Sequence, residues 1–209
     1  MHGNNSTERL NAMNKMLAGG IAALGILTGT FFHNAAAAEP VAVERGKAAV
    51  VYFSWSRTGN TRFAAQTICR KLEGRLFEIK PVKPYSRSYQ ACCMEAKPEC
   101  TNRISRPIRP VEGLNLAQFE VIFVGTPNWF GTIAPPVRTW ILENAAVLRE
   151  KTVCLFQTHG GGGMQRVGVD FAELLPEAKI LPPEAFPGKS VRSNVAALEK
   201  FAADRVTVK

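Results

Sequence analysis

This 209-residue chain lacks two common nucleotide-binding signatures and contains few histidines. It contains neither the G-x-x-x-x-G-K-[ST] loop of nucleoside-triphosphate-binding proteins nor the G-x-G-x-x-G turn that holds dinucleotides. The chain has three histidines, and His159 is the only one after residue 38. These absences argue against a triphosphatase, a dinucleotide-binding domain and a histidine-based metal site, so we predict no metal.

Acidic residues are scarce relative to basic ones, 17 against 26, which gives a net charge of +9. The basic residues are spread thinly, and aromatic residues are not interleaved with them as on a platform that stacks single-stranded nucleic acid. We therefore expect no nucleic-acid partner. The charge instead predicts a solvated basic surface that favours anionic partners or a membrane face.

Long apolar runs are confined to one stretch near the N-terminus. Arg9 and Lys15 precede an uncharged run over residues 16–32, and an Ala-x-Ala site ends at Ala38. This order is typical of a secretory signal peptide. We therefore predict export to the periplasm or cell envelope. The alternative is that the segment is not cleaved and anchors the chain in a membrane, and we expect membrane contact only in that case.

Cleavage after Ala38 would divide the chain into three parts. Residues 1–38 form the signal peptide, 39–46 a short linker and 47–209 one domain, with no internal repeat. A domain of this length can bury a substantial core.

Export would place the five cysteines in an oxidising compartment. Cys69 and Cys154 lie in regular apolar patterns, which predict buried thiols. Cys92, Cys93 and Cys100 cluster in a polar segment that contains proline. We predict one disulfide from Cys100 to either Cys92 or Cys93, and the sequence does not choose between them.

Strand-like and helical patterns alternate through the rest of the chain. Strands are predicted at 48–53, 75–80, 119–125, 152–157 and 178–181, and helices at 60–73, 135–148, 165–175 and 195–206, with a short helix near 89–96. Gly74 is expected to end the first helix as a C′ glycine. The alternation predicts an α/β fold with a parallel sheet, helices on both faces and ligands at the carboxyl ends of the strands.

The stretch from Ala48 to Phe63 carries the strongest functional signal. A β-branched strand runs through a hydroxyl-rich loop into a helix, so backbone N–H groups and the positive end of the helix dipole face an anion. The loop has no lysine, which favours a phosphate monoester held without a counter-cation. The alternative is an ordinary turn capped by Thr58 or Asn60.

Two further unusual loops follow the third and fourth predicted strands. Trp129 stands between Pro127 and Gly131, and together with Trp55 it offers flat surfaces for a planar ligand. Four consecutive glycines let the backbone approach closely, with N–H groups free to bond ring heteroatoms. A phosphate, a linker and a planar ring describe FMN. The alternatives are a core tryptophan and a flexible surface loop.

These motifs resemble those of the flavodoxin family. The run Ser56-Arg57-Thr58-Gly59-Asn60-Thr61 is similar to its [ST]-x-T-G-x-T phosphate motif, and residues 121–137 and 156–163 are similar to the ring-contacting loops of a bacterial flavodoxin-like subfamily. The resemblance covers residues 47–206. It implies a three-layer flavodoxin-like fold, with a five-stranded parallel sheet in the order 2-1-3-4-5, and a non-covalent FMN.

The resemblance implies cofactor-binding residues on all three loops. The phosphate loop contributes Ser54, Ser56, Arg57, Thr58, Gly59, Asn60 and Thr61. The first ring loop contributes Thr126, Pro127, Asn128, Trp129, Phe130 and Gly131. The second ring loop contributes Thr158, His159, Gly160, Gly161, Gly162 and Gly163.

The function that this resemblance implies is electron transfer through the flavin, with a redox partner protein or a small electron acceptor. One alternative is an FMN-dependent oxidoreductase of quinones or similar acceptors, in which His159 is either a proton donor or a loop residue bonded to backbone. The other is a binding module that keeps the fold without the flavin. Because flavodoxins that shuttle electrons are usually acidic, we expect this basic chain to have a less negative hydroquinone potential.

Overall fold

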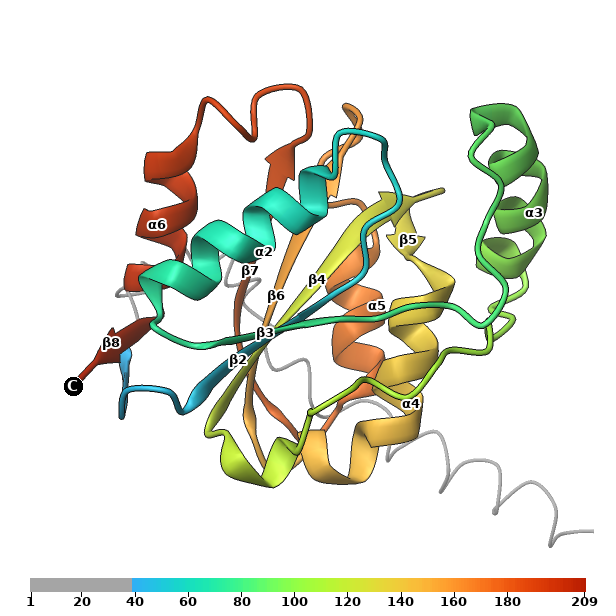
Figure 1. The fold of residues 1–209 in the computed structure, drawn as a ribbon. Coiled ribbons are helices and arrows are strands. Elements are labelled where there is room, and N and C mark those ends of the chain that lie inside the picture. Colours follow the sequence, from blue (N-terminus) through green and yellow to red (C-terminus); the bar gives the residue numbers. More distant parts are fainter. Residues whose placement is uncertain (1–38) are drawn as a thin grey trace, which may run out of the picture. The chain divides into compact units, whose positions relative to one another are not determined.

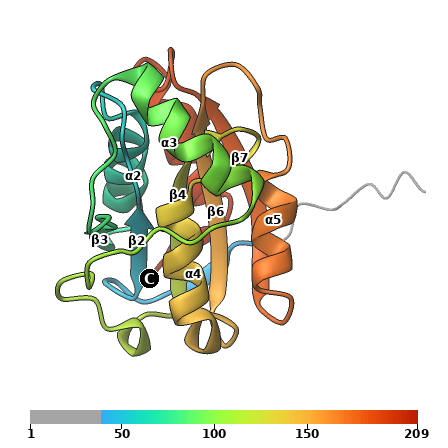
Figure 2. The ribbon, with the colours of Figure 1, turned by 90° about the vertical axis from the view of Figure 1, so that its right-hand side faces the viewer.

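The computed structural model describes residues 39–209. It shows a mostly parallel sheet between helices on both faces (Figures 1 and 2). The predicted signal peptide, residues 1–38, lies outside the described residues. Within 39–209, no helix is long and apolar enough to cross a membrane.

Strands and helices alternate along the described chain. In order they are β1 Val41–Val43, β2 Ala48–Tyr52, α2 Asn60–Lys71, β3 Arg75–Glu78, α3 Tyr89–Thr101, the 3-10 turn η1 Leu116–Gln118, β4 Val121–Trp129, β5 Thr132–Ile133, α4 Pro135–Leu148, β6 Thr152–His159, α5 Val167–Leu174, β7 Lys179–Pro187, α6 Val195–Ala203 and β8 Val206–Val208.

The main sheet confirms the predicted strand order. Its path β3-β2-β4-β6-β7 is parallel throughout, which is the order 2-1-3-4-5 of the five predicted strands. The strand count was too low, because β5 pairs antiparallel with β4, and β1 and β8 form a separate parallel pair. These strands of two or three residues are too short to show an alternating pattern. The last helix ends at Ala203 because the chain then enters β8.

The central strands are apolar throughout because both of their faces are covered. Successive side chains point to opposite faces of the sheet. Val50 and Phe123 pack in the core beneath α2 and α6, whereas Val51 and Val124 pack in the core beneath α4 and α5. All four are fully buried. Figure 2 shows α4 across β4 and β6, with α3 above it.

The predicted loop at 126–132 is largely strand. β4 continues to Trp129, and a two-residue turn, Phe130-Gly131, leads into β5. Both turn residues have positive φ, 52° and 83°, as a type I′ hairpin turn requires. Pro127 interrupts the β-branched pattern, which is why the sequence suggested that the strand ended earlier.

Gly74 has a different role from the predicted one. The left-handed residue that ends α2 is Glu73, with φ 47°. A Cβ atom on Gly74 would lie only 2.6 Å from the carbonyl oxygen of Ala48. Glycine is therefore required here because two backbone segments approach closely.

The predicted disulfide is wrong. All five cysteines are free thiols, and Cys92, Cys93 and Cys100 all lie on α3. Residues seven or eight apart on a helix are separated by about 10–12 Å, beyond the Cα range of a disulfide. The helix is longer than predicted because it accommodates Pro98 in its last turn. Among residues 39–209, no three His, Cys, Asp or Glu side chains gather in a way that could hold a metal ion.

Candidate functional site

A pocket of about 390 Å³ opens at the carboxyl ends of β2, β4 and β6. All three predicted loops line it, together with α3 and the turn after β7. The predicted residues on its surface are Ser56, Asn60, Thr61, Pro127, Asn128, Trp129, Phe130, Thr158, His159 and Gly160. Segments about a hundred residues apart therefore share one cavity. We call it the main pocket.

The phosphate loop is fixed by its own polar groups. Gly59 is left-handed, with φ 63°, and its N–H donates to the carbonyl of Ser56 at 2.8 Å. The N–H of Asn60 donates to Ser56 Oγ at 3.1 Å, and Thr58 Oγ1 donates to Asn60 Oδ1 at 2.7 Å. No side chain caps α2 at its N-cap, Gly59. Apart from the N–H of Asn60, which Ser56 accepts, the first turn therefore keeps the orphan N–H groups and the dipole end that favour an anion.

Two contacts join this loop to its neighbours. Thr61 Oγ1 and Thr158 Oγ1 lie 2.8 Å apart in a buried hydrogen bond between α2 and β6. In the turn after β7, the N–H of Gly188 donates to the carbonyl of His159 at 2.8 Å. A Cβ on Gly188 would lie 2.6 Å from Asn60 Nδ2, so this turn closes tightly onto the phosphate loop.

The two tryptophans of the main pocket belong to one aromatic cluster. The ring of Trp129 makes edge-on contacts with Tyr85, Phe53 and Trp55, at centroid distances of 4.8, 5.6 and 6.2 Å. Trp55 is oriented by its Nε1–H, which donates to the carbonyl of Ser86 at 3.0 Å. Trp129 is partly buried against the core and also lines the pocket. It is therefore both the core tryptophan and the pocket tryptophan that the sequence left as alternatives.

The glycine loop is organised around His159. Its Nδ1 accepts the N–H groups of Gly161 and Gly163, each at 3.1 Å. The carbonyl of Gly163 in turn accepts from Gln157 Nε2 at 2.7 Å and from Asn128 Nδ2 at 3.0 Å. The prediction of free N–H groups throughout this loop is therefore wrong for two of its glycines. Because Nδ1 accepts these bonds, a neutral His159 carries its proton on Nε2.

One wall of the main pocket was not predicted from the sequence. Tyr89, Cys92, Cys93 and Ala96 line it from α3. Their spacing, i, i+3, i+4 and i+7, is that of one helix face, which is the signal that could have revealed them. Burial raises the pKa of the Cys92 thiol to about 12, so this thiol stays protonated at neutral pH.

Arg106 holds α3 in place. Its guanidinium is buried, and it pairs with Glu99 at 2.6 Å and with Glu95 at 3.1 Å, both on α3. It also lies 3.8 Å from the centre of the Tyr85 ring and donates to the carbonyl of Lys83 at 3.0 Å. Its hydrogen bond lowers the pKa of Glu95. A desolvated arginine of this kind fixes its partners in one geometry.

Other predicted site residues do not line the main pocket. They are Ser54, Arg57, Thr58, Gly59, Thr126, Gly131, Gly161, Gly162 and Gly163. Thr126 is fully buried, and its Oγ1 donates to the carbonyl of Pro127 and accepts from the N–H of Ala134, which fixes the start of α4. Ser54 and Arg57 line a neighbouring pocket.

The turn after β7 was also missed. Gly188 and Lys189 line the main pocket, and Arg192 donates to the carbonyl of Thr58 while its guanidinium lies 4.7 Å from the centre of the Phe63 ring. Pro187-Gly188 marks a turn in the sequence, but only the tertiary fold brings this turn to the phosphate loop.

A family model described as flavodoxin matches residues 47–200. The chain belongs to the flavodoxin family. The match spans all three loops and α3, so the main pocket lies within the family region of this flavodoxin chain. No curated protein sequence matches it.

Solved structures share the flavodoxin fold. A proposed flavoprotein from Bacteroides uniformis is 20% identical, with 77% of this chain and 99% of that chain covered and a TM-score of 0.62. A flavoprotein from Lactobacillus acidophilus, in complex with FMN, is 19% identical, with coverages of 72% and 99% and a TM-score of 0.59. A proposed flavoprotein from Bacteroides eggerthii is 22% identical, with coverages of 73% and 97% and a TM-score of 0.58.

Proposed function

We propose that this protein binds FMN in the main pocket and transfers electrons through it in the cell envelope. The observation that carries the proposal is the convergence of an uncapped helix start, a tryptophan hairpin and a glycine loop on one cavity. Family membership and the FMN complex of the similar Lactobacillus acidophilus protein support it.

The residues of the main pocket fit the two ends of FMN. At the phosphate end, hydroxyls and helix N–H groups surround Asn60, and Gly188 leaves room where a side chain would not fit. At the other end, Trp129 and the face of α3 form apolar walls suited to a planar ring. When bound, FMN supplies the redox chemistry, and the protein supplies orientation and electrostatics.

A comparison of FMN with riboflavin tests the two-ended site. If the phosphate loop binds the phosphate, FMN quenches the fluorescence of the nearby tryptophans at concentrations at least 100-fold lower than riboflavin does. Equal affinities for both flavins would mean that the loop is an ordinary helix start.

Basic residues around the pocket favour a less negative hydroquinone potential. Arg57 belongs to the phosphate loop, Arg192 donates to the carbonyl of Thr58 in that loop, and Lys189 lines the main pocket. Positive charge stabilises an anionic hydroquinone. Potentiometric titration is expected to give a higher value for this couple than for acidic flavodoxins, and an equally low value would contradict the electrostatic argument.

An FMN-dependent oxidoreductase of quinones is the second candidate, favoured by the position of His159. This side chain lines the main pocket, and its Nε2 has no hydrogen-bond partner among residues 39–209. It could donate a proton to a bound acceptor. The test is steady-state quinone turnover in wild type and in His159→Ala. If the variant binds FMN but loses turnover, the protein is an oxidoreductase. If the protein is an electron carrier, the variant keeps its single-electron exchange.

Export to the cell envelope rests on the N-terminal sequence pattern alone. The expected observation is a mature protein that begins at Glu39 and fractionates with the periplasm, detected by mass spectrometry of cell fractions. Recovery of the full-length chain from the cytoplasm would refute export without affecting the flavin site.

A further inference from the structure

A second pocket, of about 540 Å³, adjoins the main pocket and is separated from it by Trp55 and Ser56, which line both. It lies at the carboxyl ends of β2 and β3. Ser54 lines it just after β2, and Lys80 lines it just after β3. Ligands of parallel α/β sheets bind at this edge. We call it the basic pocket.

Positive charge dominates the basic pocket. Its charged lining residues are Arg57, Arg62, Lys80, Arg87, Arg109 and a single carboxylate, Glu78. Glu78 is already paired with Arg62 at 2.5 Å. The other four cations have no ion-pair partner within residues 39–209, although Arg87 makes a long hydrogen bond of 3.4 Å to the carbonyl of Trp55. The pocket therefore holds four positive charges that no carboxylate balances.

A buried hydroxyl adds a second, independent sign of a ligand. Ser54 Oγ is shielded from solvent and has no hydrogen-bond partner among the described residues. Buried polar groups are nearly always paired, because leaving one unpaired costs about 1–3 kcal/mol. A ligand oxygen in the basic pocket would satisfy this donor.

Apart from Ser56, the remaining lining residues are apolar or aromatic. Phe53 and Tyr85 are buried beside Pro81 and Pro84, and Tyr85 belongs to the aromatic cluster around Trp129. A ligand with a short carbon skeleton can lie on these groups while its charged ends reach the rim. An inorganic counter-ion alone would leave the exposed parts of Pro81 and Pro84 uncovered.

We propose that the basic pocket binds a small organic anion that carries two or more carboxylate or phosphate groups. The four unbalanced cations supply the charge complementarity, and Ser54 supplies a neutral donor at the base. Because Trp55 and Ser56 stand between the two pockets, the anion is a ligand distinct from the flavin. Anion binding in the basic pocket does not require bound FMN.

Isothermal titration of the purified protein at low ionic strength tests this site. Citrate represents a polycarboxylate, fructose 1,6-bisphosphate an organic anion with two phosphate groups, and acetate a single charge. At least one of the first two is expected to bind with a stoichiometry of one and at least tenfold more tightly than acetate, and the tighter of the two identifies the anionic group. Failure of both to bind would overturn the proposal.

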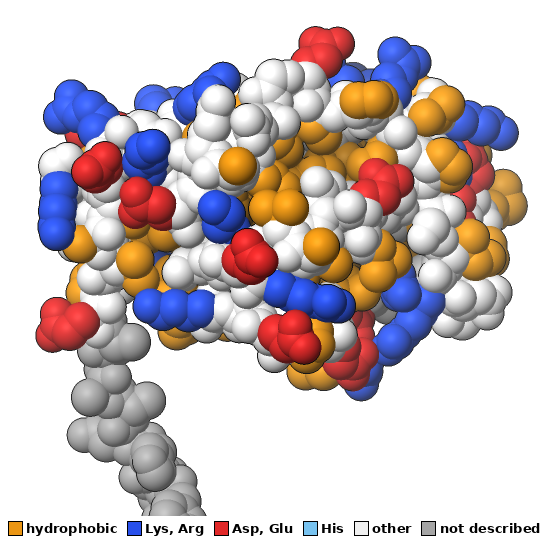
Figure 3. All heavy atoms as spheres, turned by 90° about the horizontal axis from the view of Figure 1, so that it is seen from below, with side chains coloured by type: hydrophobic (Ala, Val, Ile, Leu, Met, Phe, Trp, Pro, Cys, Tyr) orange, Lys and Arg blue, Asp and Glu red, His pale blue; other side chains and the backbone are white. Residues whose placement is uncertain are grey.

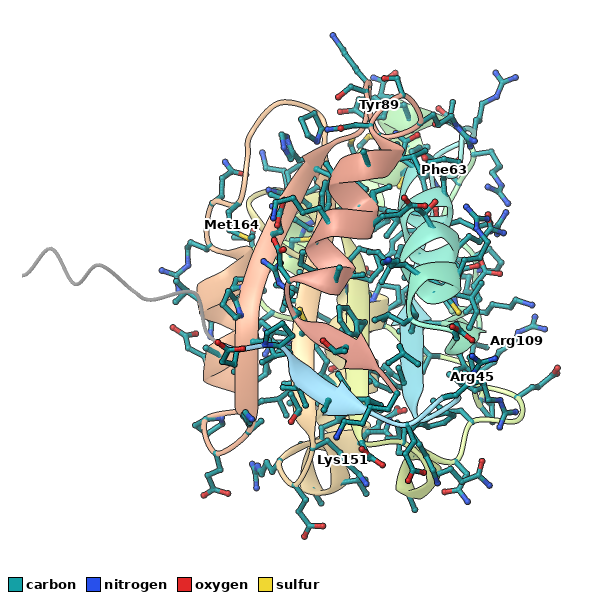
Figure 4. All side chains as sticks on the ribbon, turned by 90° about the vertical axis from the view of Figure 1, so that its left-hand side faces the viewer. Arg45, Phe63, Tyr89, Arg109, Lys151 and Met164 are labelled. Carbon is teal, nitrogen blue, oxygen red and sulfur yellow. The ribbon has the colours of Figure 1, made fainter. Side chains whose placement is uncertain are left out.

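Variants locate the binding. Arg109→Glu is expected to weaken the anion at least tenfold. Lys151→Glu makes the same change of charge just before β6, at the amino ends of the strands, and should change affinity less than threefold (Figure 4). Equal losses in both would show that only the net charge of the protein matters, and the proposal would fail.

Two further variants distinguish the basic pocket from the flavin phosphate loop. Ser54→Ala removes the buried donor without changing charge and is expected to weaken the anion at least threefold while the melting temperature is kept. Unchanged affinity in Ser54→Ala would place the anion elsewhere. Thr58→Glu should weaken the anion less than Arg109→Glu does, because Thr58 adjoins Arg57 but does not line the basic pocket. Loss of binding in that variant would assign the anion to the flavin phosphate loop.

Discussion

Thr58 is the residue whose substitution separates flavin binding from folding most cleanly. It is exposed, and its hydroxyl bonds Asn60 at the start of α2. A carboxylate there would face the phosphate of FMN, and two like charges a few ångströms apart repel by several kcal/mol at an effective dielectric constant of about 20. Thr58→Glu is therefore expected to weaken FMN at least 100-fold in a fluorescence titration, with an unchanged melting temperature.

Thr58→Gln is the matched control for this prediction. Glutamine has nearly the same size as glutamate but no charge, so this variant should retain most of the affinity for FMN. A glutamate variant that purifies with its full complement of flavin would show that the phosphate lies elsewhere.

Cys93 reports on the wall that α3 contributes to the main pocket. It is the one cysteine that is not buried, and it lines the main pocket. A maleimide at neutral pH should label it before the other four thiols, and FMN should slow this labelling at least fivefold, as followed by mass spectrometry. Cys93→Ser is the control, because its four remaining thiols are buried and should label slowly with or without FMN. Identical rates with and without FMN would place the ring away from α3.

Gly125 shows how closely the elements of the sheet are packed. It lies within β4, and a Cβ at this position would come within 2.4 Å of the Phe156 ring and 2.9 Å of Tyr52 Cβ. Overpacking of this kind typically costs about 1–3 kcal/mol. Gly125→Ala is therefore expected to lower the free energy of unfolding by about that amount, measured with urea.

Gly160→Ala is the comparison for this element. Nothing lies within 4 Å of a Cβ there, and its φ is not positive. The free energy of unfolding should change by less than about 0.5 kcal/mol. Equal effects of the two substitutions would mean that close packing at β4 is not what requires glycine.

The sequence predicted the elements that lie in the middle of the sheet better than those at its margins. β2, β4 and β6 are covered on both faces, so they appear as continuous apolar runs, and α4 was predicted with its observed ends. β1, β5 and β8 have only two or three residues each, and their pairing depends on tertiary contacts. Such pairing leaves no periodic pattern in the sequence.

The same contrast holds for the candidate site. Loops that follow central strands could be placed together, because parallel strands bring their carboxyl ends to one edge. The α3 wall was not placed in the site, although a short helix near 89–96 was predicted, because no motif ties this helix to the loops and Pro98 hides its second half. The turn at Gly188 was not placed there either, because it meets Asn60 only through the closure of the fold.

At the scale of the whole described unit, buried thiols link stability to pH. Burial raises the pKa values of Cys92, Cys100 and Cys154 to about 12, from an ordinary value of 9.0. The unfolded chain therefore loses these protons first as the pH rises. The contribution of these thiols to the free energy of unfolding is fully present below about pH 9. It is lost between pH 9 and 12, where the free energy of unfolding falls by about 1.4 kcal/mol per pH unit for each thiol.

Urea denaturation between pH 8 and 11 measures this loss of stability. The slope above pH 9 should be shallower in Cys154→Ala, because that variant has one buried thiol fewer. A stability that stays constant to pH 11 would contradict the argument.

Charge is distributed unevenly over the described unit. Figure 3 shows basic and acidic side chains interspersed on the face seen from below. At the carboxyl ends of β2 and β3, by contrast, four cations gather without balancing carboxylates. This excess of positive charge beside the flavin pocket is the feature on which the proposed binding of an anion rests.

The visible spectrum of the purified protein shows whether the main pocket holds FMN. We expect flavin absorption bands in the folded protein and release of equimolar FMN on denaturation, identified by mass spectrometry. A protein that is colourless and does not take up added FMN would contradict this expectation, and the fold would then serve as a binding module without a flavin.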